Sequence, residues 1–203
     1  FRQDPVERVG RIVAVTGAHA VILIDAEDNS VQNPNKSPEI GTLLKVDTAK
    51  SISLAMVSAL SSPMPSHSKD DKELRIIEVE FIGELPKDAQ GNPVGFRRGI
   101  SCYPSLGDIV FRANKRELEK AYACDADTAI RVGHIQQDET IPAMIKIDEL
   151  LGKHFAVLGT TGTGKSCTVA LILRRILEKN PQAHILLLDV HREYANAFKE
   201  YAE

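Results

Sequence analysis

The sequence lacks several features that would define a specialised class of protein. It has no tryptophan, and aromatic residues make up only 5 % of its 203 positions. Its three cysteines, Cys102, Cys124 and Cys167, are widely spaced and include no CxxC pair, which argues against both a disulfide framework and a structural zinc site. No stretch approaches the ~18 apolar residues of a membrane span, and the N-terminus has no hydrophobic signal core. We therefore expect a cytoplasmic protein without a membrane partner.

The charge balance excludes a free-standing nucleic-acid binder. Lys and Arg together number 25 and Asp and Glu number 28, which gives a formal net charge of −3. Neutralising even ~6 phosphates requires clustered basic residues, whereas here they alternate with acids. The hydrophobic share of 43 % is that of an ordinary globular protein and excludes disorder over most of the chain.

The first half of the sequence is typical of short β-strands. Apolar or alternating segments are separated by turn signals, and two polar loops, 27–39 and 61–72, interrupt them. The expected strands are residues 11–15, 20–24, 41–46, 51–56, 74–85 and 107–111. Strands of this number and length predict a small barrel or sandwich, followed by a charged helix at residues 114–122.

The second half has the pattern of an α/β unit. We expect segments 128–134 and 141–147 to pair, followed by a helical turn at 148–151. Two continuous apolar runs, 154–158 and 185–189, flank a helix over about 164–179. Such runs are typical of parallel strands covered on both faces, so strand, helix and strand form one βαβ unit. The helix is expected to bury one stripe, formed by Val169, Ile172, Leu173, Ile176 and Leu177.

A phosphate-binding motif lies between the first apolar run and the helix. Residues 159–166 read GTTGTGKS and match G-x-x-x-x-G-K-[ST] directly after an expected strand, which is the context that supports a P-loop. Its glycines allow the backbone to approach phosphate closely, and successive N–H groups with the positive end of the helix bind the phosphates. Lys165 supplies a charge to the β- and γ-phosphates, and the Ser166 hydroxyl a ligand for Mg²⁺. The expected cofactors are ATP and Mg²⁺, with nucleotide-binding residues Gly159, Thr161, Gly162, Thr163, Gly164, Lys165, Ser166 and Cys167.

Two acidic residues follow the second apolar run. Asp189 and Glu193 lie where the carboxyl end of a parallel strand meets the ligand crevice. We expect them, together with Lys165, to be the catalytic candidates, orienting water, sensing the γ-phosphate or contacting a neighbouring subunit. The alternative is that Asp189 caps a turn and Glu193 is merely solvated.

These residues resemble HerA-type ATPases of the HerA/FtsK group of P-loop motors. The resemblance lies in residues 154–166, the helix 168–177 and the segment 185–194, although Arg192 stands where that group usually has glycine before the glutamate. The β-rich half, with Val9–Ile12 and Gly107–Val110, is similar to the HAS barrel of the same group. The resemblance implies a β plus α/β fold: a β-barrel assembly domain over residues 1–118 and the start of a RecA-like P-loop ATPase domain over 119–203.

The resemblance also implies a function. HerA-type proteins form hexameric rings that move double-stranded DNA with ATP, together with a nuclease or effector docked on the barrel, in DNA end processing or anti-phage defence. One or two Lys per subunit, repeated around a ring, would supply ~6–12 phosphate contacts despite the acidic chain.

Two parts of such a motor are not found in this sequence. After the P-loop there is no apolar strand ending in Asp-Glu, and no arginine finger can be assigned. We expect these 203 residues to be an incomplete ATPase domain that does not turn over ATP alone. The alternatives are a P-loop motor acting on a substrate other than DNA, and a barrel-based assembly scaffold.

Overall fold

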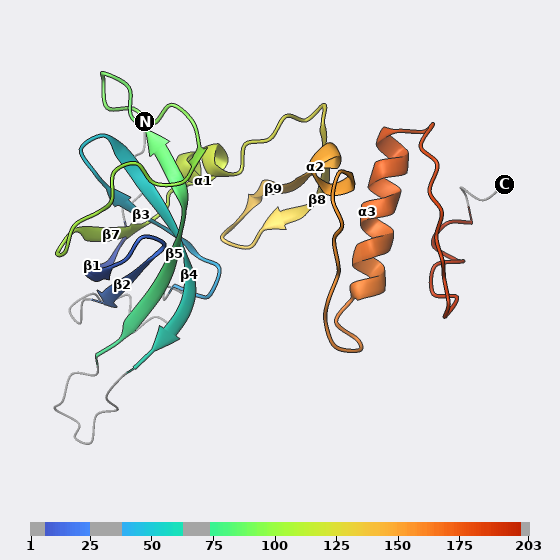
Figure 1. Cartoon of the computed structure of the whole chain (residues 1–203), viewed down its shortest axis with the longest axis horizontal. Coiled ribbons are helices and arrows are strands. Elements are labelled where there is room, and N and C mark those ends of the chain that lie inside the picture. Colours follow the sequence, from blue (N-terminus) through green and yellow to red (C-terminus); the bar gives the residue numbers. More distant parts are fainter. Residues whose placement is uncertain (1–6, 25–37, 63–73, 200–203) are drawn as a thin grey trace. The chain divides into compact units, whose positions relative to one another are not determined.

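The computed structural model describes residues 7–24, 38–62 and 74–199, so most of the two polar loops lies outside the described residues. The chain divides into two compact units, residues 1–123 and 124–203. Each unit has its own buried core. Figure 1 shows the helices and strands of both units.

The first unit is the expected β-barrel. Its strands are β1 (Arg8–Val15), β2 (His19–Ile24), β3 (Leu43–Asp47), β4 (Ser51–Ser61), β5 (Ile76–Pro86), β6 (Arg97–Arg98) and β7 (Ile109–Arg112). They follow the order β2-β1-β7-β3-β4-β5-β6, and the pairing of β2 with β5 closes all of them except β6 into a ring (Figure 1). Closure leaves few unpaired strand edges, which is how small antiparallel β proteins avoid edge-to-edge association.

Alternation of side chains along the strands creates the barrel core. On β5, Ile77 and Val79 are buried whereas Glu78 and Glu80 are exposed, as the period of two requires. The core cluster comprises Val9, Ile12, Ala20, Ile22, Leu44, Val46, Ala55, Val57, Ile77, Val79 and Val110. The sequence pattern therefore predicted this half of the fold correctly.

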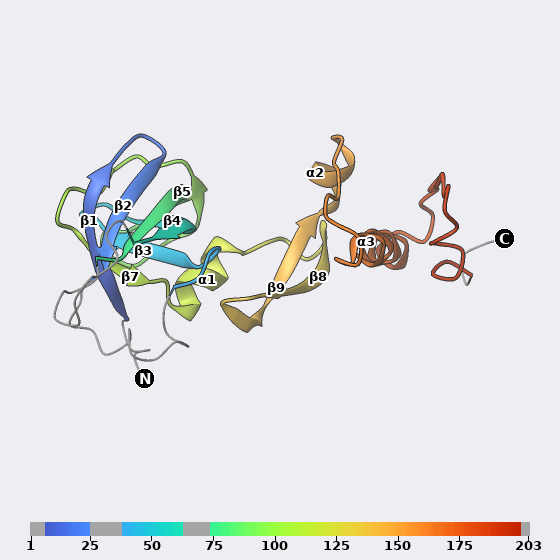
Figure 2. The same ribbon diagram turned by 90° about the horizontal axis from the view of Figure 1, so that it is seen from below.

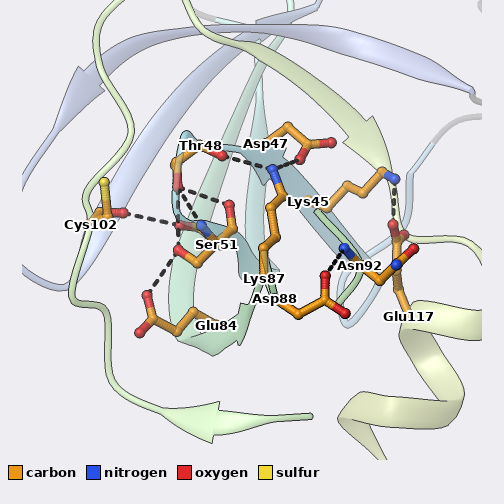
Figure 3. A network of polar contacts seen from close by, with 11 residues as sticks. Lys45, Asp47, Thr48, Ser51, Glu84, Lys87, Asp88, Asn92, Cys102 and Glu117 are labelled. Carbon is orange, nitrogen blue, oxygen red and sulfur yellow. Dashed lines mark hydrogen bonds and ion pairs between the residues drawn. The ribbon is translucent and has the colours of Figure 1, made fainter. Parts of the chain in front are cut away.

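A buried carboxylate ties the segment around β6 to the barrel. Glu84, on β5, is only 1 % exposed. It accepts hydrogen bonds from the hydroxyls of Ser51 (3.0 Å) and Ser101 (2.6 Å), from the Ser101 N–H (3.1 Å) and from Arg97 Nη2 (2.9 Å); its contact with Ser51 is drawn in Figure 3. Burial by itself raises the pKa of Glu84, but the hydrogen bonds from Ser101, Ser51 and Arg97 outweigh it and lower the pKa to about 2.

A buried ion pair fixes α1 (Lys115–Ala121) to the barrel. Lys45 Nζ on β3 lies 2.5 Å from Glu117 Oε1, and both side chains are more than nine-tenths buried (Figure 3). Glu117 also closes a capping box with Asn114 at the start of the helix, which satisfies two backbone N–H groups there. Since Glu117 does both, the same side chain starts α1 and attaches it to β3.

The second unit packs a helix on a hairpin. Strands β8 (Ala129–Ile135) and β9 (Asp138–Lys146) pair antiparallel, α2 (Ile147–Leu151) follows, and α3 (Lys165–Lys179) lies against β8 (Figures 1 and 2). Four isoleucines form its buried core cluster, Ile130, Ile147, Ile172 and Ile176, and Ala129 and Ile141 are buried as well. The expected hairpin, helical turn and helix are confirmed. Within the described residues, no helix is long and apolar enough to cross a membrane.

Two expectations for the second unit were wrong. Residues 154–158 and 185–189 do not join a β-ladder, and Leu158, Leu186 and Leu188 are 89 %, 89 % and 84 % exposed. An apolar run indicates a strand that needs covering elements, but no described strand pairs with either segment. For the same reason, only Ile172 and Ile176 of the expected α3 stripe are buried, whereas Val169, Leu173 and Leu177 are half-buried.

The Glu84 network makes the stability of the barrel depend on pH. The folded-state pKa of Glu84 is lowered from 4.5 to about 2, so ionised Glu84 stabilises the barrel above pH 4.5 and this contribution is lost as the pH falls toward 2. We expect Glu84→Gln to lower the unfolding free energy by roughly 2–3 kcal/mol at pH 7 and by much less at pH 2.5. Denaturant unfolding at both pH values measures the difference. Glu78→Gln, an exposed position on the same strand, serves as control, and an equal loss at both pH values would contradict the prediction.

Candidate nucleotide-binding site

The glycine-rich segment forms a compact turn that leads directly into α3. Gly162 and Gly164 have φ of +85° and +87°, a backbone conformation that residues with a Cβ rarely adopt. Gly164 is the N-cap of α3. Within the described residues, no side chain at this cap accepts a hydrogen bond from the first N–H groups of the helix. The first N–H groups of a helix have no partner within the helix, which makes this end suited to an anion.

One carbonyl oxygen organises the turn. The Thr160 carbonyl accepts hydrogen bonds from the Thr163 N–H (3.4 Å), the Thr163 hydroxyl (2.8 Å) and Lys165 Nζ (2.7 Å). The Lys165 side chain therefore folds back over the loop. Because an ammonium bonds more strongly to a phosphate oxygen than to a neutral carbonyl, an incoming phosphate can replace Thr160 as its partner.

The first turn of α3 carries the remaining motif residues. Ser166 is half-buried, and its hydroxyl donates a hydrogen bond to Glu193 Oε2. Cys167, the next residue, has an exposed free thiol. The structure thus brings Glu193 to the P-loop serine across 27 positions of sequence.

A capped turn holds the segment that carries Glu193. The carboxylate of Asp189 accepts the N–H of Glu193 at 3.0 Å and the N–H of Tyr194 at 2.9 Å. Arg192, which lies between Asp189 and Glu193, has a φ of +57°, the one positive value among the described non-glycine residues. Asp189 therefore caps a turn, and Glu193 accepts a hydrogen bond from the P-loop serine; the catalytic roles expected of both residues stay predictions.

The oxygen donors of the site fit Mg²⁺. This cation usually binds one or two protein oxygens together with waters and substrate phosphates, and a serine hydroxyl beside a carboxylate provides such donors. Within the described ranges, no group of three or more His, Cys, Asp or Glu side chains could hold a metal by itself. A cation at this site would therefore depend on Ser166, Glu193 and the phosphates of a nucleotide.

Sequence reasoning missed two features of the site. The role of the Thr160 carbonyl has no signal in the motif, which leaves that position unspecified. The positive φ at Arg192 did have a signal in the sequence, because glycine is usual at this position in the group that the sequence resembles. A glycine preference before the glutamate indicates a left-handed residue.

Comparison with known proteins identifies the family. Residues 130–203 match the family model described as the central domain of the helicase HerA. A probable DNA double-strand break repair helicase HerA of Methanocaldococcus jannaschii is 30 % identical over 133 residues, which are 66 % of this chain and 24 % of that protein. Residues 130–203 therefore belong to the HerA-type helicase family. The P-loop, α3 and the Asp189 turn all lie within the matched HerA central domain.

Two further relatives match shorter or longer parts of the chain. A DNA double-strand break repair helicase HerA of Pyrococcus furiosus is 33 % identical over 90 residues, 44 % of this chain and 16 % of that protein. An uncharacterized protein of Aquifex aeolicus is 30 % identical over 144 residues, 67 % of this chain and 49 % of that protein. The chain thus spans about half or less of the relatives that it matches.

The close packing at Gly159 gives a testable consequence. A Cβ at this position would lie 2.6 Å from Thr163 Oγ1 and 3.5 Å from Lys165 Cγ. We expect Gly159→Ala to displace Thr163 from the Thr160 carbonyl and to weaken nucleotide binding about tenfold, the effect of losing roughly one good hydrogen bond. A fluorescent ATP analogue measures the affinity. Gly133→Ala is the matched control, since a Cβ there meets nothing within 4 Å; equal affinities for both variants would contradict the prediction.

Proposed function

We propose that the chain is part of an ATP-driven translocase or helicase that acts on double-stranded DNA. The observation that carries the proposal is the P-loop turn on α3 within a segment that matches the HerA central domain. The relatives suggest the substrate, since the similar Pyrococcus protein is a DNA double-strand break repair helicase.

In this proposal ATP and Mg²⁺ bind between the glycine-rich turn and the Asp189 turn. The backbone N–H groups of the loop and of the first turn of α3 hold the phosphates, through the residues Gly159, Thr161, Gly162, Thr163, Gly164 and Cys167. Lys165 leaves the Thr160 carbonyl for the β- and γ-phosphates, and Ser166 ligates Mg²⁺, which neutralises phosphate charge. Glu193 lies at the cation side of the site, on Ser166.

The assembly is proposed to be a hexameric ring with a nuclease or effector partner bound on the barrel, in DNA end processing or anti-phage defence. The barrel is a compact unit with its own core, as an assembly module requires. Repetition of a few basic residues around a ring reconciles DNA binding with a net charge of −3.

The proposed activity is tested on the full-length protein. We expect ATP hydrolysis that increases with double-stranded DNA, and Lys165→Ala should reduce it by about a hundredfold or more, because the cation that stabilises phosphate charge is lost. Phosphate release with and without DNA measures this. Lys153→Ala, an exposed lysine of the same unit, should retain activity.

Two results would contradict the proposal in different ways. Unchanged turnover in Lys165→Ala would exclude the P-loop as the ATPase site. Hydrolysis that is indifferent to DNA would favour a motor that acts on another substrate.

A further inference from the structure

The contact between Ser166 and Glu193 joins the P-loop helix to the turn after residue 188. Glu193 accepts the hydroxyl proton of Ser166 through Oε2. A hydrogen bond to an ionised carboxylate is stronger and more directional than one between neutral groups. It therefore fixes the direction of the Ser166 hydroxyl and leaves the lone pairs of Oγ free for another partner.

The backbone around Glu193 is held independently of that contact. Asp189 Oδ1 accepts the Glu193 N–H, Oδ2 accepts the Tyr194 N–H, and Asp189 is half-buried. This double cap keeps Arg192 at a φ of +57°, a conformation uncommon for residues other than glycine. Such a backbone persists where surrounding contacts over-determine it, so the turn presents Glu193 in a defined direction.

The same geometry has a consequence for a divalent cation. A ligand whose proton is held by a carboxylate is oriented for the metal and is a better donor to it, and such outer partners typically change metal affinity 10–100-fold. The negative charge of Glu193 further raises the expected Mg²⁺ affinity, because a carboxylate attracts a divalent cation and oxygen atoms are its preferred ligands.

We propose that Glu193 sets the Mg²⁺ affinity of the P-loop through the Ser166 hydroxyl, and that the Asp189-capped turn through Arg192 positions Glu193 for this task. The inference rests on the proposed binding of ATP and Mg²⁺ at this loop. Glu193 is exposed, so its hydrogen bond contributes little to folding and its substitution leaves the unit folded.

The test separates nucleotide binding from cation binding. Affinity for a fluorescent ATP analogue is measured in EDTA and then during a Mg²⁺ titration, in wild type, Glu193→Gln and the control Glu178→Gln, which changes an exposed acid of α3 paired with Arg175. For Glu193→Gln we expect an EDTA affinity within about twofold of wild type and a Mg²⁺ midpoint raised roughly 10–100-fold. An unchanged or lowered Mg²⁺ midpoint overturns the inference, as does an equal rise in the control.

Substitutions at Arg192 test the positioning. Glycine adopts a positive φ freely, whereas a β-branched residue does not. Arg192→Gly should keep the wild-type Mg²⁺ midpoint, and Arg192→Val should raise it in the same direction as Glu193→Gln. If Arg192→Val retains the wild-type midpoint, the turn does not position Glu193.

Failure of the proposed function gives a different result. If the wild-type protein binds no ATP analogue, or if Lys165→Ala binds it as well as wild type does with and without Mg²⁺, the P-loop is not a nucleotide site. If Lys165→Ala weakens nucleotide binding but Glu193→Gln leaves the Mg²⁺ midpoint unchanged, the inference alone is overturned.

Discussion

The packing of α3 against β8 and the first residue of α2 is the contact on which the candidate site depends. Ile172 and Ile176 of the helix bury their side chains against Ile130 and Ile147, and each such burial stabilises by about 1.5–3 kcal/mol. The apolar segments before and after the helix are not paired as strands, so they add no ladder hydrogen bonds to hold it. The N-terminal end of α3, with Lys165 and Ser166, is therefore placed by this small core together with the turn of the loop itself.

The barrel is stabilised by a different combination of forces. Closure by the β2–β5 pair encloses a core of aliphatic residues. The buried charges on β3 and β5 have partners on neighbouring strands, on the segment after β6 and on α1. Glu84 is satisfied by Ser51, Ser101 and Arg97, and Lys45 by Glu117. Removing one partner of a buried pair leaves an uncompensated charge, which costs about 3–5 kcal/mol. Such groups specify where α1 and the β6 segment attach more than they add net stability.

Much of this architecture could be predicted because it depends on local patterns. Alternation predicted the barrel strands, and the G-x-x-x-x-G-K-[ST] motif predicted the turn before α3, since both follow from backbone periodicity and glycine content. The state of residues 154–158 and 185–189 could not be predicted in the same way. An apolar run indicates that a segment would be stable as a buried strand. Whether neighbouring strands and helices bury it depends on the rest of the structure. The Thr160 carbonyl and the Glu84 network were missed because they join residues through space without any periodic spacing.

Binding of a nucleotide and its hydrolysis make different demands on this chain. Binding needs backbone N–H groups, a cation and a ligand for Mg²⁺, which are the roles proposed for the loop, Lys165 and Ser166 at the end of one helix. Hydrolysis further needs an acid to position water and a cation to stabilise the transition state, and neither an Asp-Glu strand end nor an arginine finger can be assigned in this sequence. Both carboxylate oxygens of Asp189 accept backbone N–H groups of the turn that carries Glu193, and its role as a catalytic candidate stays a prediction. Glu193 accepts a hydrogen bond from Ser166, the residue that is proposed to hold Mg²⁺. The contacts among the described residues therefore support the proposed binding of a Mg²⁺-nucleotide more directly than they support its hydrolysis.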